Sequence, residues 1–99
     1  MKFLKRYKTQ INELCKTHKV KSLYAFGSVL NEKFNSDSDI DLIVDFYEVT
    51  LEEYADNYFE LKFTLQDILK RPIDLLEAQA IKNPFFKKKI DNQKELIYG

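Results

Sequence analysis

Four segments are predicted to be helical, because their apolar residues recur every three to four positions or because a capping residue precedes them. They are Lys2–Lys19, Ser28–Phe34, the segment from Thr50 to Leu69 and the segment from Asn83 to Asn92. Thr50 is the expected N-cap of the third of these helices. Glu52 and Glu53 follow it in the first turn, where the helix dipole favours acidic side chains. Asn83 and Pro84 form a similar cap and first turn.

Short apolar segments lie between these helices and are predicted to be strands, because they are rich in β-branched and aromatic residues. They are Val20–Phe26, Asp39–Phe46, Pro72–Glu77 and Leu96–Tyr98. Helices and strands therefore alternate along one domain of residues 1–99. The expected fold class is α+β, resembling an α/β sandwich, with a small mixed sheet and helices packed on one face.

Side-chain alternation divides the second strand into an apolar face and an acidic face. Ile40, Leu42 and Val44 point to one side, whereas Asp39 and Asp41 point to the other together with Ile43 and Asp45. In the third strand, Asp74 has the same relation to its apolar neighbours Ile73 and Leu75. If the two strands are neighbours, Asp39, Asp41 and Asp74 meet above one surface of the sheet.

Carboxylates this close repel one another unless a cation lies between them. Asp39 and Asp41 are about 6.6 Å apart along an extended strand. Oxygen donors suit Mg²⁺, and carboxylate-bridged ions activate hydroxyl groups in phosphoryl transfer. Gly27 and Ser28, where a strand turns into a helix, offer backbone N–H groups to a phosphate. These residue types together indicate a metal-dependent nucleotide site.

The acidic segment also has features of two other kinds of structure. Asp37, Asp39, Asp41 and Glu48 occupy positions 1, 3, 5 and 12 of a calcium loop, but position 6 is Leu42 where that loop requires glycine. An acidic surface turn without chemistry is the common alternative for clustered aspartates. Gly27-Ser28 and Asp74 favour the nucleotide site over that alternative.

The order of these motifs resembles the minimal nucleotidyltransferase (MNT) family of the polymerase-beta superfamily. The motifs are Gly27-Ser28, then Ser38-Asp39-Ile40-Asp41-Leu42-Ile43-Val44, then Ile73-Asp74-Leu75. The resemblance covers nearly the whole chain, and the combination of motifs is far more specific than either Gly-Ser or Asp-x-Asp alone.

The resemblance implies an activity and a role for each motif. Gly27 and Ser28 would bind nucleotide phosphates, while Asp39, Asp41 and Asp74 would be catalytic and hold Mg²⁺. Such proteins transfer a nucleoside monophosphate, typically AMP from ATP, to a hydroxyl group. Many are antitoxins whose acceptor is a tyrosine of a HEPN-type partner toxin. The resemblance thus implies an Mg²⁺-dependent nucleotidyltransferase of the protein adenylyltransferase type.

The chain departs from the family pattern after Gly-Ser. Relatives commonly continue as Gly-Ser-x-Ala-Arg-Gly, whereas this chain has Val29-Leu30-Asn31-Glu32. A phosphate-facing cation is therefore missing, and Lys33 or Arg71 are the candidates to replace it. One alternative is an inactive binding module that neutralises a partner by contact; another is transfer to a small molecule such as an aminoglycoside.

Composition restricts the remaining function classes. Sixteen basic and sixteen acidic residues give a net charge of zero, so direct nucleic-acid binding is not expected. No apolar segment suggests a signal peptide or a membrane span, so a cytoplasmic location is expected. A homodimer is left open. The single cysteine, Cys15, is expected to be a buried hydrophobe.

A histidine, a lysine run and two phenylalanines lie outside these motifs. His18 is expected to pack or cap the first helix and not to act as a catalytic base. The lysines 87–89 are expected to form a solvated helix face. Phe59 and Phe63 lie off the main apolar stripe, so they form either an exposed patch for a partner helix or extra core.

Overall fold

The protein is built around a four-stranded mixed sheet. The computed structural model describes residues 2–30, 35 and 37–99. The strands are β1 (Val20–Phe26), β2 (Ile40–Phe46), β3 (Ile73–Glu77) and β4 (Glu95–Tyr98), in the spatial order β3-β2-β1-β4. β1 runs antiparallel to both β2 and β4, whereas β2 and β3 are parallel. The expected mixed sheet is confirmed.

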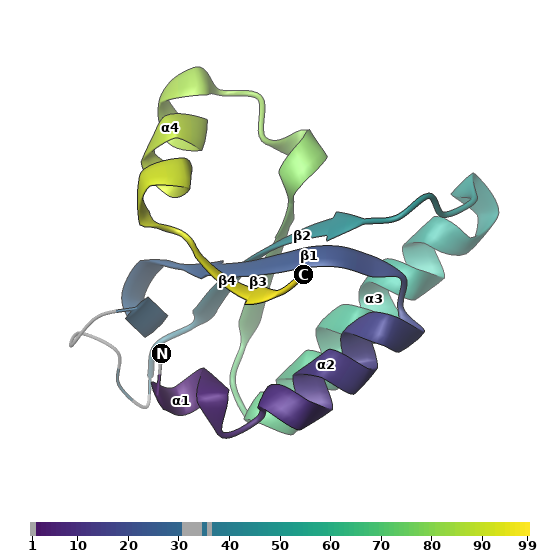
Figure 1. Ribbon diagram of the computed structural model, residues 1–99, viewed down its shortest axis with the longest axis horizontal. Coiled ribbons are helices and arrows are strands. Elements are labelled where there is room, and N and C mark those ends of the chain that lie inside the picture. Colours follow the sequence, from purple (N-terminus) through teal and green to yellow (C-terminus); the bar gives the residue numbers. More distant parts are fainter. Residues whose placement is uncertain (1, 31–34, 36) are drawn as a thin grey trace.

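Helices lie on both sides of the sheet. They are α1 (Lys2–Lys5), α2 (Lys8–Thr17), α3 (Leu51–Leu69) and α4 (Pro84–Gln93), with short 3-10 turns η1 (Gly27–Leu30) and η2 (Ala78–Ala80). Figure 1 shows α2 and α3 together under one face of the sheet and α4 on the opposite side. The long helices therefore pack on one face as expected, and α4 covers part of the other.

The N-terminal helix is interrupted, so the prediction of one continuous helix over Lys2–Lys19 was wrong. The backbone turns at residues 6 and 7, where the Tyr7 N–H donates to the Leu4 carbonyl oxygen in a tight i to i−3 bond of 3.1 Å. The turn allows Leu4 to be buried while α2 independently buries Ile11, Leu14 and Cys15. A single apolar period over both segments concealed this change of direction.

The predicted helix over Ser28–Phe34 is replaced by a shorter turn. Residues 27–30 form the 3-10 turn η1, and residues 31–34 lie outside the part of the chain that the structure describes. Val29 is buried against the core, which fixes the turn immediately after β1.

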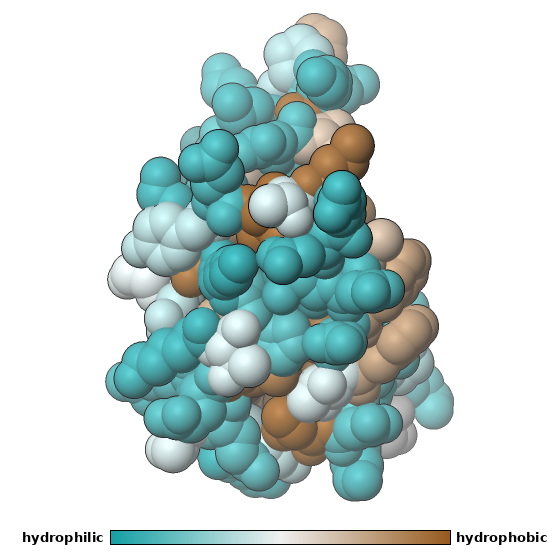
Figure 2. Space-filling view, turned by 90° about the vertical axis from the view of Figure 1, so that its right-hand side faces the viewer, coloured by the Kyte–Doolittle hydropathy of each residue, from teal (hydrophilic) through white to brown (hydrophobic). Residues whose placement is uncertain are grey.

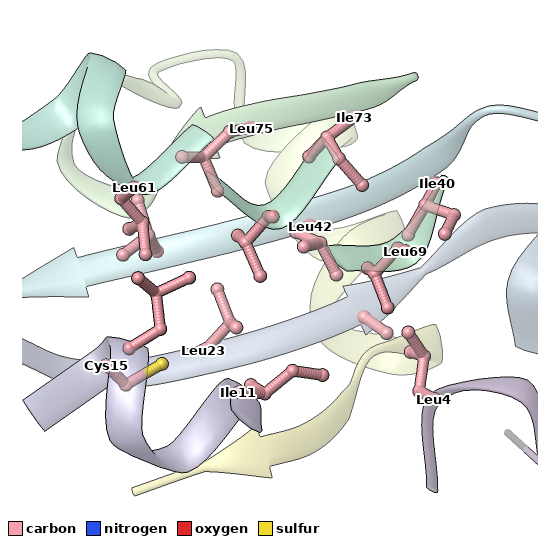
Figure 3. Close-up of a cluster of buried hydrophobic side chains, with 14 of the residues drawn as sticks. Leu4, Ile11, Cys15, Leu23, Ile40, Leu42, Leu61, Leu69, Ile73 and Leu75 are labelled. Carbon is pink, nitrogen blue, oxygen red and sulfur yellow. The ribbon is translucent and has the colours of Figure 1, made fainter. Parts of the chain in front are cut away.

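One hydrophobic core lies between the sheet and helices α2 and α3, as Figure 3 shows. β1 and β2 contribute Leu23, Ile40 and Leu42, and the helices contribute Ile11, Cys15, Leu61, Leu65 and Leu69. Burying each large aliphatic side chain stabilises the fold by roughly 1.5–3 kcal/mol. The core therefore holds β2 and β3 rigidly beneath their acidic face.

α3 begins as predicted, with the Thr50 side chain accepting a hydrogen bond from the Glu53 N–H at 3.3 Å. The sequence places Leu51 at the start of the apolar stripe of this helix, but Leu51 is 92% exposed at the first helical position, so that part of the prediction was wrong. Phe59 and Phe63 are 48% and 53% exposed and stack on each other at 5.8 Å between ring centroids. They form an exposed patch and are not extra core.

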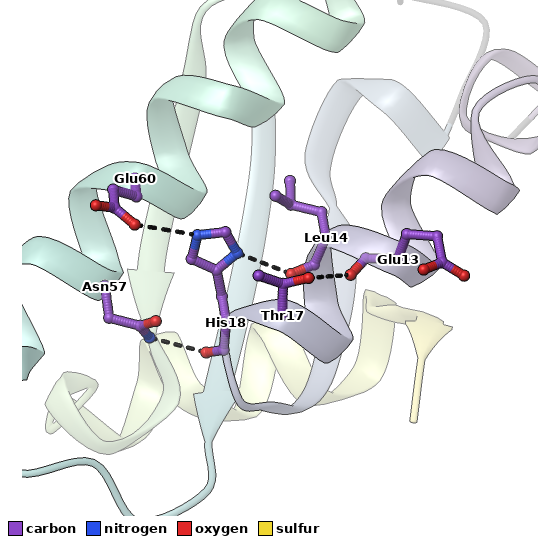
Figure 4. A network of polar contacts seen from close by, with 6 residues as sticks. All are labelled: Glu13, Leu14, Thr17, His18, Asn57 and Glu60. Carbon is purple, nitrogen blue, oxygen red and sulfur yellow. Dashed lines mark hydrogen bonds and ion pairs between the residues drawn. The ribbon is translucent and has the colours of Figure 1, made fainter.

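His18 ends α2 and packs as predicted. Its Nδ1 lies 2.9 Å from the Leu14 carbonyl oxygen and its Nε2 lies 3.5 Å from Glu60 on α3. The Asn57 side-chain amide donates to the His18 carbonyl oxygen at 2.8 Å, as Figure 4 shows. These contacts join α2 to α3, so His18 has a structural role.

The surface is mainly polar. Figure 2 shows a largely hydrophilic face with small hydrophobic areas between the polar side chains. Lysines 87–89 are all exposed on α4, as predicted for a solvated face. Among the described residues, no helix is both long enough and apolar enough to cross a membrane.

Candidate active site

The parallel pairing of β2 and β3 brings two of the predicted aspartates side by side. Asp41 pairs in register with Asp74, and the flanking pairs are Ile40 with Ile73 and Leu42 with Leu75. The flanking residues are buried in the core, whereas Asp41 is half-buried and Asp74 is exposed on the opposite face. Neighbouring strands are about 4.8 Å apart. The predicted alternation and adjacency of these strands are therefore confirmed.

Gly27 lies directly against the Asp41 carboxylate. Phe26, the last residue of β1, pairs with Asp41, and Gly27 then turns the chain with a φ of 79°. A Cβ atom at Gly27 would be 2.5 Å from Asp41 Oδ2. Both the left-handed backbone and the close approach require glycine. The Gly-Ser turn and the acidic strand are thus parts of one surface, with Ser28 next to them, half-buried in η1.

The turn before Asp39 is ordered by its own polar groups. The Asn35 N–H donates to Ser38 Oγ at 3.1 Å, and the Asp37 N–H donates to Asn35 Oδ1 at 2.8 Å. Asp39 follows this turn, is exposed, and precedes the first residue of β2. It is therefore held by the turn and not by the strand ladder.

Arg71 fastens this turn to the segment between α3 and β3. Its Nη1 donates to the carbonyl oxygens of Asn35 at 2.5 Å and Ser38 at 3.2 Å, and its guanidinium lies 5.2 Å from the centroid of the Phe3 ring. The sequence suggested Arg71 as a replacement phosphate ligand. The structure shows Arg71 hydrogen-bonded to the acidic turn, a contact for which the sequence held no local signal, and its role toward phosphate stays a prediction. The other candidate, Lys33, and the departing residues Asn31 and Glu32 lie outside the described residues.

Burial and neighbouring negative charges act together on the carboxyl group of Asp41. The pKa of Asp41 is raised, first by burial and then by the negative charges of Asp74 and Asp39. Each of these causes disfavours the charged carboxylate. A cation above the sheet would offset the repulsion from Asp74 and Asp39 and favour the charged form of Asp41.

The donor set fits a hard cation, although the side chains do not form a closed cage. Within the described part of the chain, no three His, Cys, Asp or Glu side chains converge closely enough to form a metal-binding group. Asp41 and Asp74 offer only oxygen donors, which Mg²⁺ prefers, and Mg²⁺ commonly binds through one or two carboxylates while keeping several waters. Asp39, the third predicted ligand, is exposed in the turn just before β2 and is not brought into a three-carboxylate group with them.

Cys15 does not take part in this site. It is fully buried in the core, and burial raises the pKa of its thiol to about 12. A thiol that stays protonated at neutral pH is a poor nucleophile. The sequence prediction of a buried hydrophobe is therefore confirmed.

Comparison with known proteins identifies the family. The family model described as "Polymerase beta, Nucleotidyltransferase" matches residues 9–99. Two proteins of Methanocaldococcus jannaschii, both named "Putative protein adenylyltransferase", are 40% identical over 95 residues and 36% identical over 96 residues. Each alignment covers 96% of this chain and 89% of the relative.

Solved structures share the fold at lower sequence identity. A "putative minimal nucleotidyltransferase" superposes with a TM-score of 0.76 at 24% identity, over 93% of this chain and 90% of that chain. A chain of a toxin–antitoxin crystal structure with AMP-PNP gives a TM-score of 0.72 at 21% identity, over 93% and 73% of the two chains. A chain of the complex of the tri-AMPylated Shewanella oneidensis HEPN toxin with its MNT antitoxin gives 0.66 at 20% identity, over 96% and 71%. With the match over residues 9–99 and these relatives, the chain belongs to the polymerase-beta nucleotidyltransferase family.

Proposed function

We propose that the protein is a nucleotidyltransferase that transfers AMP from ATP to a tyrosine hydroxyl of a HEPN-type partner and thereby acts as an antitoxin. The observation that carries the proposal is the in-register pair Asp41 and Asp74 beside Gly27, on the face of the sheet opposite the core. Catalysis of phosphoryl transfer depends mainly on positioning and charge neutralisation. This surface places carboxylates next to the Gly27 turn, where the lack of a side chain lets a phosphate approach the backbone closely.

Each residue has a distinct task in the proposed reaction. Asp39, Asp41 and Asp74 would hold Mg²⁺, which when bound neutralises phosphate charge and activates the attacking hydroxyl. Gly27 and Ser28 would orient the phosphates through backbone N–H groups. The acceptor oxygen forms a bond to the α-phosphorus as the bond to the β-phosphate oxygen breaks. Pyrophosphate leaves, and Asp74 accepts the hydroxyl proton.

The relatives support the class of acceptor. The Methanocaldococcus jannaschii proteins are named as protein adenylyltransferases. One structural neighbour is an antitoxin in a complex whose HEPN toxin is tri-AMPylated, and another comes from a toxin–antitoxin complex with AMP-PNP. A HEPN-type protein and ATP are therefore the partner and the nucleotide proposed for this chain.

The test is transfer of label from ATP to a HEPN-type partner protein. With Mg²⁺ and ATP labelled at the α-phosphate, the partner is expected to become labelled, whereas ATP labelled at the γ-phosphate gives none. The double variant Asp39→Ala, Asp41→Ala should lose transfer while its circular dichroism spectrum stays native. The single variant Asp37→Ala is the matched control, since Asp37 is an exposed aspartate of the same turn.

Two results would contradict the proposal. One is transfer by the double aspartate variant at the rate of the unmodified protein, which would place the chemistry elsewhere. The other is labelling that continues without divalent ions, which would remove the role given to the carboxylates.

A second candidate is an inactive member that neutralises its partner by contact alone. The observation in its favour is Val29-Leu30-Asn31-Glu32 in place of the family's Ala-Arg-Gly segment. The engagement of Arg71 with backbone carbonyls adds to it, because that cation serves the turn. Calorimetry separates the two candidates: the inactive module binds the partner but gives no saturable heat with ATP and Mg²⁺.

A further inference from the structure

An open groove lies along the outer edge of β3, between that strand and α3. Its volume is about 370 Å³. Its lining is mainly apolar, with Tyr54, Tyr58 and Phe59 from α3 and Leu75, Leu76 and Glu77 from β3. β3 is the first strand in the order β3-β2-β1-β4, so its outer side pairs with no other described strand. We call this hollow the β3-edge groove.

Exposed aromatic rings extend the β3-edge groove over the surface of α3. Phe59 lines the groove, and Phe63, one helical turn farther on, stacks on it. Both side chains are about half exposed. The Tyr58 ring meets Phe59 edge to face, with 5.1 Å between the ring centroids. Large apolar side chains that stay exposed together in this way mark interaction surfaces.

The β3-edge groove is next to the candidate active site. Leu76 points to the same face of the sheet as Asp74, and residues two apart in a strand are separated by about 6.6 Å. Tyr58 also lies near Asp74: burial raises the pKa of the Tyr58 phenol first, and the negative charges of Asp74 and Glu77 raise it further. A segment bound in the groove would therefore bring a neighbouring hydroxyl group to Asp74, the residue proposed above to accept the hydroxyl proton.

The backbone edge of β3 is partly occupied by side chains of α3. The Ile73 N–H donates to Gln66 Oε1 at 3.3 Å, and the Tyr58 hydroxyl donates to the Leu75 carbonyl oxygen. A strand that extends a sheet needs a row of free N–H and C=O groups along the edge. These two contacts interrupt that row. The groove therefore favours a segment that binds through its side chains, as an amphipathic helix does.

Negative charge surrounds the β3-edge groove. α3 carries five acidic residues and one lysine. Asp56 is three positions before Phe59, and Asp67 is four positions after Phe63, so these two carboxylates flank the aromatic rings on the same side of the helix. Glu77 lines the groove itself. A basic segment is attracted by this arrangement, whereas an acidic segment is repelled.

We infer that the β3-edge groove is the docking site of the acceptor, a basic segment of the partner protein that carries large apolar side chains beside the modified tyrosine. This inference rests on the proposed function, because it assumes that a tyrosine of a partner receives AMP. Phe59 and Phe63 bind the segment, and no part of the reaction is assigned to them. The acceptor is selected by the side chains around its tyrosine and not by the tyrosine alone.

Three synthetic peptides of equal length, each with one central tyrosine, test the inference. The first surrounds the tyrosine with leucine and arginine, the second with leucine and glutamate, and the third with serine and arginine. Fluorescence anisotropy measures their affinity, and ATP labelled at the α-phosphate measures AMP transfer to them. The leucine–arginine peptide is expected to bind about tenfold or more tightly than either of the others and to be the best acceptor.

Phe59→Ser is the test variant, and Phe85→Ser is its matched control. Phe85 is an aromatic residue of α4 that is 84% exposed, so each variant removes one exposed ring. Phe59→Ser should weaken binding of the leucine–arginine peptide about tenfold. It should also raise KM for a HEPN-type partner protein with kcat unchanged, because it removes a contact made equally in the ground state and the transition state.

Phe85→Ser should leave peptide affinity and KM unchanged, and both variants should keep the ATP affinity of the unmodified protein in calorimetry with Mg²⁺. If Phe59→Ser loses its native circular dichroism spectrum, Phe63→Ser replaces it, since Phe63 belongs to the same ring stack. Chemical-shift mapping gives an independent measurement: the leucine–arginine peptide should shift the backbone amides of Phe59 and Leu76 and leave that of Phe85 in place.

Failure of this inference is distinguishable from failure of the proposed function. Equal affinity for the three peptides, or an unchanged KM in Phe59→Ser, overturns the docking site and leaves the metal and nucleotide surface as it is. A dimer in sedimentation equilibrium that Phe59→Ser converts to a monomer also overturns it, because the groove then holds a second copy of the chain. Selective peptide binding at the groove without AMP transfer to any acceptor supports the docking site, contradicts the proposed transfer and favours the inactive module.

Discussion

The paired carboxylates of Asp41 and Asp74 should make the metal-free protein less stable than its neutralised variant. Two full charges about 5 Å apart repel by about 3 kcal/mol at an effective dielectric constant of about 20. Asp74 is exposed, so solvent screens most of this, and like charges on opposed strand positions destabilise by about 0.2–1 kcal/mol. Asp41→Asn should therefore raise Tm in EDTA by about 1–8 °C, using about 4–8 °C per kcal/mol for a domain of this size.

The sign of the pH dependence follows from the raised pKa of Asp41. The fold binds the Asp41 proton more tightly than the unfolded chain does, so this group favours folding below the ordinary carboxyl pKa of 3.8. That contribution is lost as the pH rises through the raised pKa. Asp41→Asn removes this fall in stability at higher pH. Mg²⁺ should also remove it in the unmodified protein, since binding at 100 times Kd adds about 2.7 kcal/mol.

Thermal unfolding at low salt, with EDTA or with Mg²⁺, measures both effects. Asp56→Asn is the control, because Asp56 is an exposed aspartate of α3 and the variant changes the net charge equally. The expected pattern is that Asp41→Asn is more stable than the unmodified protein in EDTA and gains less from Mg²⁺. The reasoning is refuted if Asp41→Asn destabilises the metal-free protein while Asp56→Asn does not, or if both variants respond equally to Mg²⁺.

Three further outcomes are expected. Gly27→Ala should destabilise the fold by about 1–2 kcal/mol, measured by urea unfolding, because alanine resists a φ of 79°, and it should abolish transfer because its Cβ would displace the Asp41 carboxylate. Arg71→Ala should cost about 1 kcal/mol and speed amide hydrogen exchange at Ser38, whose turn it holds; unchanged exchange would show that the turn orders itself. Cys15, with a pKa of about 12, should react with a thiol reagent at pH 8 only after denaturation.

Most of the sheet could be predicted from the sequence, because strand alternation is a local signal with a strong energetic cause. A shift of one residue in β2 would bury Asp41 and expose Leu42, so the register of faces is fixed by the residues themselves. The same argument placed Asp74 opposite the core. The helix N-caps at Thr50 and Asn83 could also be predicted, because each side chain accepts a hydrogen bond from a backbone N–H group within the following turn.

Features that depend on contacts distant in the sequence could not be predicted in this way. Arg71 bonds to carbonyl groups 33 and 36 residues away, and no local pattern encodes that distance. The turn at residues 6 and 7 preserves the helical spacing of apolar residues on both sides. The sequence pattern therefore gave no sign of the break between α1 and α2. The face chosen by α4 depends on how η2 leaves β3, which apolar spacing within α4 does not determine.

The charge distribution on the open face connects the family departure to the position of α4. A net charge of zero hides a local excess of negative charge where Asp41 pairs with Asp74, whereas beneath α4 two lysines, Lys87 and Lys94, are balanced by Asp45 and Asp91. An acidic surface without a bound cation repels ATP, because phosphate and carboxylate charges have the same sign. An arginine after Gly-Ser, as in the family pattern that the sequence resembles, would place a cation beside the phosphates. The lysines of the α4 region do not supply that cation, because Lys94 pairs with Asp91 at 2.9 Å and Asp45 lies beside them, so neutralisation of the phosphates at Asp41 and Asp74 depends on a divalent cation.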